Sequence, residues 1–463
     1  MSTKRGPTRR RLLIGGGVIS AVAAGGLGFR RSITSQVRRW TRSPEFAATP
    51  ALLPHDPKTE RRTVTVARGG TPAGNVDAVI DKIGLETVVG TDDLVIIKVA
   101  AQWWNQGMTN VAAARRVIER VLARPGFRGE VVVFENTHFR LADGSGLARA
   151  FTRPSQRNVD VPGWSTLGDL AASYKTAGAP VSFVGLVDGG ASQLAGDPWH
   201  DPGHAHGVYG GDGRGPIAAG EVRDGYRWDF ARTFEKKRGW FETSRTPLTW
   251  PVFTSPRSGL QIDLADGVFE VHGGTRARTG RKLTWIQLAT VNEHASTGMT
   301  ACCKSAMGIV DMSAGRLGTH PLAAGYQSIH YFGNPDATWR MAGPLAFFAD
   351  QVRKPDLYLA IAEWVAITPA AGTPGWKGGD EMDLRLEEVS AHQARTVAGG
   401  TDPVAIDWWC AGNVLSPIAQ EIRGANRADL DVRDPDSKVS RFLRYYREVA
   451  RAGTMDDGLI TVA

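Results

Sequence analysis

A strand, a helix and a second strand follow one another within residues 94–135, and this order constrains the fold more than any other feature. Residues 94–99 (LVIIKV) form an apolar run typical of a buried strand. Residues 110–122 carry apolar side chains at helical spacing, and residues 130–135 (EVVVFE) have the pattern of a second strand. Because such a segment needs a right-handed crossover, it predicts a βαβ unit with two parallel strands.

Further apolar runs predict that this unit belongs to a larger α/β domain. We expect strands over 181–187, 283–291 and 357–367, and helices over 298–307, 403–415 and 440–452. Between about 141 and 280 the pattern weakens and Gly, Trp and His are common, which indicates a loop-rich insertion with short strands. The predicted fold is α/β, a mostly parallel sheet with flanking helices that occupies residues 63–463.

The first 62 residues differ in character from the rest. Arg9-Arg10 precedes an uncharged, Gly- and Ala-rich run that ends at Phe29, which resembles a twin-arginine export signal. We expect residues 1–30 to be this signal or an uncleaved anchor, and residues 31–62 to be a linker. The resemblance implies export across the cytoplasmic membrane by the twin-arginine translocation machinery, with membrane contact through the N-terminal segment alone.

The charge distribution argues against nucleic-acid binding. The formal net charge is +8, but residues 1–42 hold ten Lys and Arg residues and no acid, which leaves −2 for the remainder. A body near neutrality lacks the positive surface that phosphate backbones require. We therefore expect a small-molecule ligand and no nucleic acid.

The cysteines limit which cofactors the chain could bind, and the tryptophan pairs bear on how it packs. The three cysteines, Cys302, Cys303 and Cys410, form no C-x-x-C motif, so we expect no iron–sulfur cluster and no cysteine-rich zinc site. Cys410 could form a disulfide with one of the other two, or all three could be buried thiols; the sequence leaves this open. The pairs at 103–104 and 408–409 (both WW) favour core packing over a pocket lining.

Polar residues stand at the ends of several expected strands. Lys98 and Glu135 end the first two, Asn136 and His138 follow the second, Asp188 follows 181–187, and residues 292–294 (NEH) follow 283–291. Ligands of open α/β sheets bind outside the carboxyl ends of the strands, so this edge is the predicted site. Asn136 and Asp188 are more simply explained as polar residues where a strand leaves the core than as members of a site.

Residues 294–308 give the sharpest candidate. Thr297, Thr300 and Lys304 are three and four positions apart, so on a helix they would share one face. Together with the free N–H groups of a helix start they would suit a carboxylate or a phosphate. A capped helix with Lys304 extended to solvent explains the same spacing, and the sequence does not separate the two.

A second candidate lies in the insertion. His200, His204 and His206 stand among aspartates in a Gly- and Pro-rich stretch, which makes them candidate metal ligands. A solvated polar loop is the favoured interpretation, because the spacing fits no metal motif.

Several blocks resemble the bacterial and archaeal family known as domain of unknown function 362. They are the strand ending at Lys98, the helix and strand that follow it, and His294 with the G-x-T of 298–300 and the K-x-x-x-G of 304–308. The most specific is DPVAID at 402–407. The resemblance implies that Lys98, Glu135, His294, Thr300, Lys304, Asp402 and Asp407 form one site. Some members carry ferredoxin-like cysteine motifs, which this chain lacks.

These features together predict an exported enzyme that acts on a small acidic substrate near Lys304 and His294. Catalysis is assigned to Glu135, His294, Lys304 and Lys98, with Glu135 or His294 as general acid or base. Substrate binding is assigned to Thr297, Thr300, Asp402 and Asp407, although Asp402 also suits a helix cap and Asp407 a support for either lysine. The cofactor is open, and a metal held by Glu135, His294 and Asp407 is one option. The alternatives are an exported ligand-binding protein that uses the same anion pocket, and a surface protein with solvated strand ends.

Overall fold

The computed structural model describes residues 61–136, 149–187, 208–209, 217, 221–238, 242–311, 329, 338–369 and 388–463. The expected export signal, the linker up to residue 60, and His138, Asp188, His200, His204 and His206 lie outside the described residues. Among the helices described, none combines the length and the apolar character needed to cross a membrane.

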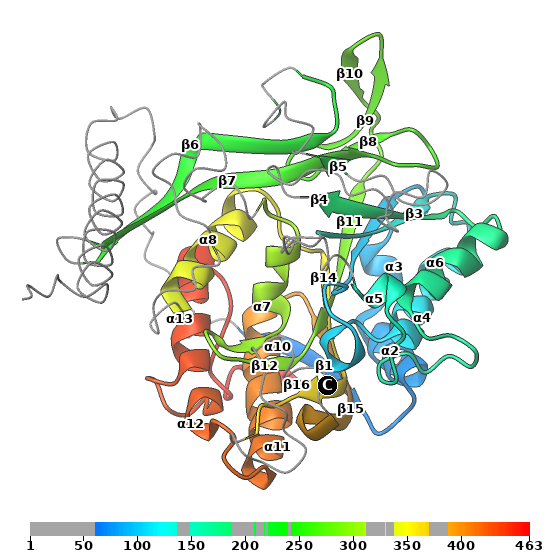
Figure 1. Ribbon diagram of the computed structural model, residues 1–463. Coiled ribbons are helices and arrows are strands. Elements are labelled where there is room, and N and C mark those ends of the chain that lie inside the picture. Colours follow the sequence, from blue (N-terminus) through cyan, green and yellow to red (C-terminus); the bar gives the residue numbers. More distant parts are fainter. Residues whose placement is uncertain are drawn as a thin grey trace, which may run out of the picture.

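A mixed, mostly parallel sheet of nine strands forms the centre of the molecule (Figure 1). Its order is β16-β1-β15-β14-β11-β2-β3-β4-β5. The strands from β14 to β5 are parallel to their neighbours, whereas β15 runs antiparallel to both β14 and β1. The predicted α/β class is therefore confirmed. The bounds are β1 Arg62–Arg68, β2 Leu94–Lys98, β3 Glu130–Asn136, β4 Val181–Val187, β5 Val208–Tyr209, β11 Leu283–Thr290, β14 Leu357–Ala366, β15 Ala391–Gly400 and β16 Ile460–Val462.

Helices cover both faces of this sheet, which explains why its central strands are mostly apolar. On one face lie α2 (Pro72–Ile83), α4 (Val111–Leu122) and α6 (Leu167–Thr176). On the other lie α7 (Cys302–Ser305), α8 (Thr338–Gln351), α10 (Pro403–Cys410) and α13 (Lys438–Ala450) (Figure 1). Helix α4 begins where the sequence predicts, because the Asn110 side chain accepts a hydrogen bond from the backbone N–H of Ala113 at 3.0 Å.

Short elements complete the described chain. They are α3 Leu85–Val88, α5 Arg149–Thr152, α11 Ser416–Glu421, α12 Arg427–Leu430, and the 3₁₀ turns η2 Asn105–Gly107, η4 Ala306–Gly308 and η7 Glu388–Ser390. A π-helical turn, η8 (Ala411–Leu415), joins α10 to α11. The helix predicted over 403–415 is thus interrupted at residue 411 and resumes as α11.

A second, antiparallel sheet lies above α8 (Figure 1), in the segment expected to hold loops and short strands. Its order is β10-β9-β8-β7-β6, with β6 Gly225–Arg238, β7 Glu242–Thr254, β8 Gln261–Asp263, β9 Gly267–His272 and β10 Thr275–Arg278. Strands β6 and β7 have 14 and 13 residues, longer than the sequence suggests. The same segment also contains α6 and β4 of the main sheet.

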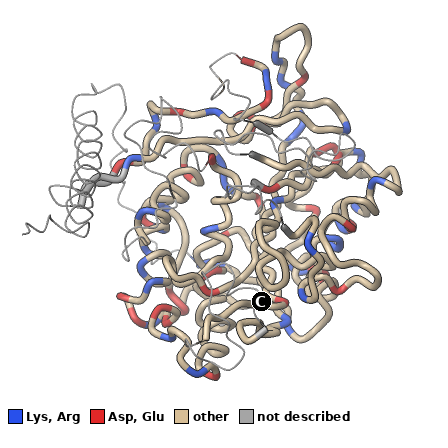
Figure 2. Tube along the Cα trace, in the orientation of Figure 1, with Lys and Arg blue, Asp and Glu red and all other residues tan. Residues whose placement is uncertain are grey.

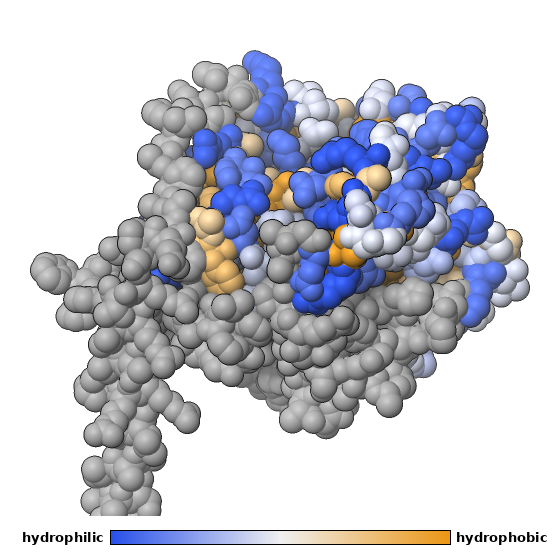
Figure 3. Space-filling view, turned by 90° about the horizontal axis from the view of Figure 1, so that it is seen from above, coloured by the Kyte–Doolittle hydropathy of each residue, from blue (hydrophilic) through white to orange (hydrophobic). Residues whose placement is uncertain are grey.

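Charges of both signs are interspersed over the described chain (Figure 2). In the second sheet, for example, the buried Asp263 carboxylate pairs with Arg227 at 3.3 Å and with Arg276 at 3.0 Å. Seen from above, at 90° to the view of Figure 1, hydrophilic residues dominate the described surface and apolar residues form small patches (Figure 3). The near balance of charge agrees with the sequence.

The helix predicted over 298–307 is wrong at its start, because the chain is helical only from Cys302 to Gly308. Residues Gly298–Thr300 form strand β13, which pairs antiparallel with β12 (Asn292–His294), and α7 is a single turn that begins at Cys302. The reason lies at Gly298, whose φ of +78° is a left-handed conformation that a helix cannot contain. A Cβ on this glycine would stand 2.6 Å from the backbone nitrogen of Val439, so close packing against α13 fixes the turn.

Candidate functional site

Lys98 and Glu135 form a buried ion pair at the carboxyl edge of the main sheet. Lys98 ends β2, and Glu135 lies one residue before the end of the neighbouring parallel strand β3. The Lys98 Nζ is 2.8 Å from the Glu135 Oε2, and each side chain is 3% exposed. The structure thus brings together two of the residues that the sequence assigned to catalysis, at the edge where it predicted a site.

The segment after β13 covers this pair. The Lys98 Nζ also donates a hydrogen bond to the Ser305 Oγ at 3.1 Å. Further along, a Cβ on Gly308 would stand 2.4 Å from the Glu135 Oε1 and 2.7 Å from the Lys98 Nζ. Position 308 therefore needs glycine for the close approach of the backbone to the ion pair.

Gln287 extends the cluster along the sheet. It is in register with Lys98 across β11 and β2, and its Nε2 donates to the Cys302 carbonyl oxygen at 2.9 Å. Its Oε1 is buried and accepts no hydrogen bond from any residue that the structure describes. A buried acceptor without a partner is uncommon in folded proteins.

The pKa of Glu135 is raised from its ordinary value of 4.5 to about 7. Burial is the main cause, because it disfavours the charged carboxylate, and the ammonium of Lys98 offsets part of the effect. A carboxyl that titrates near neutrality can both accept and release a proton at physiological pH. Glu135 therefore has the property that a general acid or base requires.

Asp407 holds α7 in place. Its two carboxylate oxygens accept hydrogen bonds from the backbone N–H groups of Cys302 and Cys303, both at 2.8 Å, and its side chain is fully buried. This arrangement caps the single turn that carries Lys304 and Ser305. Burial raises the pKa of Asp407 to about 7, against the two backbone hydrogen bonds, which lower it. Asp407 is a positioning residue for α7.

Asp402 caps α10. Its side chain accepts hydrogen bonds from the backbone N–H groups of Val404 at 2.9 Å and Ala405 at 3.1 Å. It also accepts from the backbone N–H of Thr454 and pairs with Arg62, each at 3.2 Å. These contacts match the cap that the Asp-Pro sequence suggests, and they direct the carboxylate away from a substrate role.

His294 lies at the end of β12 in a hairpin of its own. Its Nδ1 accepts a hydrogen bond from the backbone N–H of Ser296 at 3.1 Å, which leaves the proton of the neutral ring on Nε2. The Thr297 Oγ1 is 3.2 Å from the same nitrogen and donates to the Met299 carbonyl oxygen. These two contacts of His294 lie within its own turn, and β13 of this hairpin contacts α12 and α13.

Lys304 and Thr300 meet, but not across a helix face. The Lys304 Nζ donates to the Thr300 Oγ1 at 3.3 Å, because β13 passes through Ala301 directly into α7. Thr297 belongs instead to the turn around His294. The expectation that Thr297, Thr300 and Lys304 share one helix face is wrong, while the pair of Thr300 and Lys304 remains a candidate anion contact. Lys304 is 7% exposed.

The described residues contain no group of three or more His, Cys, Asp or Glu side chains arranged to hold a metal. The metal set of Glu135, His294 and Asp407 is thus corrected: both oxygens of Asp407 are bound to backbone N–H groups. Cys302, Cys303 and Cys410 are buried free thiols, which selects the second of the two readings that the sequence left open.

Sequence reasoning missed Ser305, Gly308 and Gln287. Ser305 and Gly308 lie in the K-x-x-x-G block, in which Lys304 is the only charged residue. Gln287 carries a signal of its own, since it is the one amide side chain in a strand of apolar residues and threonines. The contact of Lys98 with Ser305 spans 207 positions, so no local pattern could reveal it.

The two raised carboxyl pKa values predict a pH dependence of stability. Because the folded protein binds these protons more tightly than the unfolded chain, the free energy of unfolding should fall as pH rises from about 4.5 to about 7. Each carboxyl should contribute on the order of 1–3 kcal/mol. In the Glu135→Gln variant the free energy of unfolding should fall less over this pH range, because the contribution of Glu135 is gone. Urea unfolding at several pH values would measure the difference. An unchanged pH slope would refute the raised pKa of Glu135.

Comparisons of the chain with protein-family models, with curated proteins and with solved structures found no match. The resemblance to the domain of unknown function 362 family therefore stays a prediction. It is carried by the blocks around Lys98, His294, Lys304 and Asp402.

Proposed function

We propose that the protein is an enzyme that transfers a proton to or from a small acidic substrate at the carboxyl edge of the main sheet. The observation that carries this proposal is the Lys98–Glu135 ion pair, buried beside Ser305 and Gly308. Burial of this kind is costly, and a pKa of about 7 at Glu135 suits acid–base chemistry better than it suits stability.

Each residue of the cluster has a role in the proposal. Glu135 is the general acid or base, and Lys98 stabilises its charged form. The Ser305 hydroxyl, which accepts from Lys98, can pass a proton between the pair and the substrate. In this proposal the acidic group of the substrate meets the Lys304 ammonium, which donates to the Thr300 Oγ1 at 3.3 Å.

The test is a search for proton transfer with a matched pair of variants. The wild type is incubated at pH 7 in deuterated water with a panel of small carboxylic and phosphoric acids, and mass spectrometry follows turnover and deuterium uptake. We expect at least one substrate to react, with a loss of about 100-fold or more in Glu135→Gln, as is typical for a general acid or base. Glu86→Gln, at an exposed position of α3, should react as the wild type does.

The outcomes separate this proposal from its alternative. Equal turnover by the wild type and Glu135→Gln would contradict the role of Glu135. Binding of a panel member that Lys304→Gln weakens, without any turnover, would instead favour a ligand-binding protein that uses the Thr300–Lys304 pair.

We also propose that the protein is exported and that it belongs to the domain of unknown function 362 family. Arg9-Arg10 and the apolar run after it support export. Replacement of both arginines by lysine should leave the full-length protein in the cytoplasm, as cell fractionation would show. Unchanged export of that variant would contradict the twin-arginine route.

A further inference from the structure

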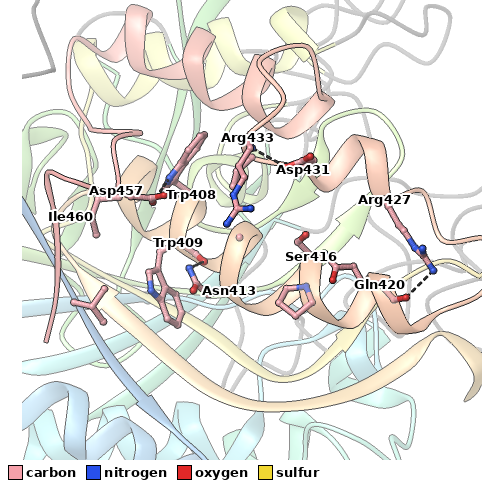
Figure 4. A pocket seen from close by; sticks show the side chains of 14 residues that line it. Trp408, Trp409, Asn413, Ser416, Gln420, Arg427, Asp431, Arg433, Asp457 and Ile460 are labelled. Atoms are coloured by element: carbon pink, nitrogen blue, oxygen red, sulfur yellow. Dashed lines mark hydrogen bonds between the residues drawn. The ribbon is translucent and has the colours of Figure 1, made fainter.

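A cavity of about 990 Å³ lies between α10, η8, α11 and the connection from α12 to α13, and it shares no residue with the Lys98–Glu135 cluster (Figure 4). Its volume is at the upper end of the range of about 300–1,000 Å³ for small-molecule sites. Its wall includes the π-helical turn η8, an element that is rare and often found at functional sites.

Two neighbouring indole rings form one side of this cavity. The Trp408 Nε1 donates to the Asp457 Oδ1 at 2.8 Å, and the Arg68 guanidinium stacks on the Trp409 ring, 4.7 Å from its centroid. Both rings are therefore held in fixed orientations. Both tryptophans pack against the core as expected, Trp409 within it and Trp408 at its edge, and both also line the cavity.

Polar groups that the fold itself does not use face these rings. The Arg433 guanidinium points into the cavity between Trp408 and Ser416, and it makes no hydrogen bond or ion pair within the described part of the chain (Figure 4). In the same described part, the Ser416 hydroxyl and the Gln420 amide make no hydrogen bond, and the Asn413 Oδ1 accepts none.

Arg427 shows the contrast with Arg433. Its guanidinium donates to the carbonyl oxygens of Ala419, Gln420 and Ile422, so it caps the end of α11. Arg427 thus stabilises the wall of the cavity, whereas the Arg433 guanidinium makes no such contact. The Asp431 carboxylate also lines the cavity and accepts from the backbone N–H of Arg433 at 2.9 Å.

From these groups we infer that the cavity binds a small acidic sugar, a sugar ring that bears a carboxylate. The apolar C–H face of a sugar ring packs on an indole, and its hydroxyls need donors and acceptors such as those of Asn413, Ser416 and Gln420. A guanidinium binds a carboxylate through two parallel hydrogen bonds, which is the role of Arg433. An aromatic acid would make no hydrogen bonds with the hydroxyl and the two amides.

Titration calorimetry with D-glucuronate, D-glucose and benzoate tests this inference. Glucuronate should bind the wild type, with glucose at least about tenfold weaker and benzoate weaker still. Arg433→Gln should lower the affinity for glucuronate at least about tenfold and remove the preference over glucose. Trp408→Leu should weaken glucuronate and glucose alike, because both stack on the same ring.

The matched control is Arg423→Gln. Arg423 is another exposed arginine without a hydrogen bond or ion pair in the described part of the chain, and it does not line the cavity. This variant should bind glucuronate as the wild type does, and thermal unfolding should show that both Arg→Gln variants are folded. Three results would overturn the inference: no glucuronate binding at millimolar concentration, equal loss in both variants, or benzoate bound as tightly as glucuronate.

Discussion

Replacement of Lys98 by methionine should lower the free energy of unfolding at pH 8 by about 3–5 kcal/mol. The variant keeps most of the volume of the side chain but leaves the Glu135 carboxylate buried without its counter-ion, which is 2.8 Å away in the wild type. It also removes the hydrogen bond to the Ser305 Oγ. Urea unfolding monitored by circular dichroism would measure the difference.

The pH dependence of this loss identifies its cause. Lys98 lowers the pKa of Glu135, so its removal should raise that pKa further above about 7. At pH 5 Glu135 should then be protonated in the folded variant, and the loss should be smaller than at pH 8. Lys82→Met, at an exposed position of α2, should change the stability by less than about 0.5 kcal/mol. The same loss at both pH values would argue against an uncompensated charge.

A double variant tests the same point from the other side. Lys98→Met combined with Glu135→Leu replaces the pair by two apolar side chains, which is often neutral or stabilising for a buried ion pair. If the double variant recovers most of the stability but no activity, the pair is retained for chemistry rather than for folding.

The parts of the fold that depend on local pattern could be predicted from the sequence. Strands β2, β3 and β4 agree with their predicted bounds to within one residue, because apolar runs of this kind must be buried on both faces. Asn110 and Asp402 cap their helices as expected, since capping uses side chains next to the helix start. Lys98 and Glu135 meet because the carboxyl ends of neighbouring parallel strands lie together.

The remaining parts depend on contacts between distant segments. Gly298 cannot begin the helix predicted over 298–307, because α13, some 140 residues later, packs closely against it. Asp407 caps α7 across 105 positions. The Trp409 ring packs against Arg68, near the start of the described chain, and the Trp408 Nε1 donates to Asp457, near its end. Contacts between distant segments leave no periodic pattern in the sequence. A prediction from local spacing alone therefore places Thr297, Thr300 and Lys304 on one helix face.

Helix α10 connects the two candidate sites. Asp407 projects from it to α7, which carries Lys304 and Ser305, and the next two residues, Trp408 and Trp409, line the cavity. A ligand that shifts α10 in the cavity would therefore act on the cap of α7. Loss of that cap should affect stability and turnover whichever ligand binds at either site.

Asp407→Ala should lower the free energy of unfolding by about 2–4 kcal/mol, because it leaves the buried N–H groups of Cys302 and Cys303 without an acceptor. It should also abolish any turnover that depends on Glu135, since α7 would no longer hold Ser305 against Lys98. Asp407→Asn keeps one acceptor oxygen, so it should lose less stability and less turnover than Asp407→Ala. Asp402→Ala is the control for a helix cap elsewhere: it should cost about 1–2 kcal/mol while turnover persists in the folded fraction. If Asp407→Ala retained full turnover in its folded fraction, α7 would not position the catalytic groups, and Lys98 and Glu135 would have to act without Ser305.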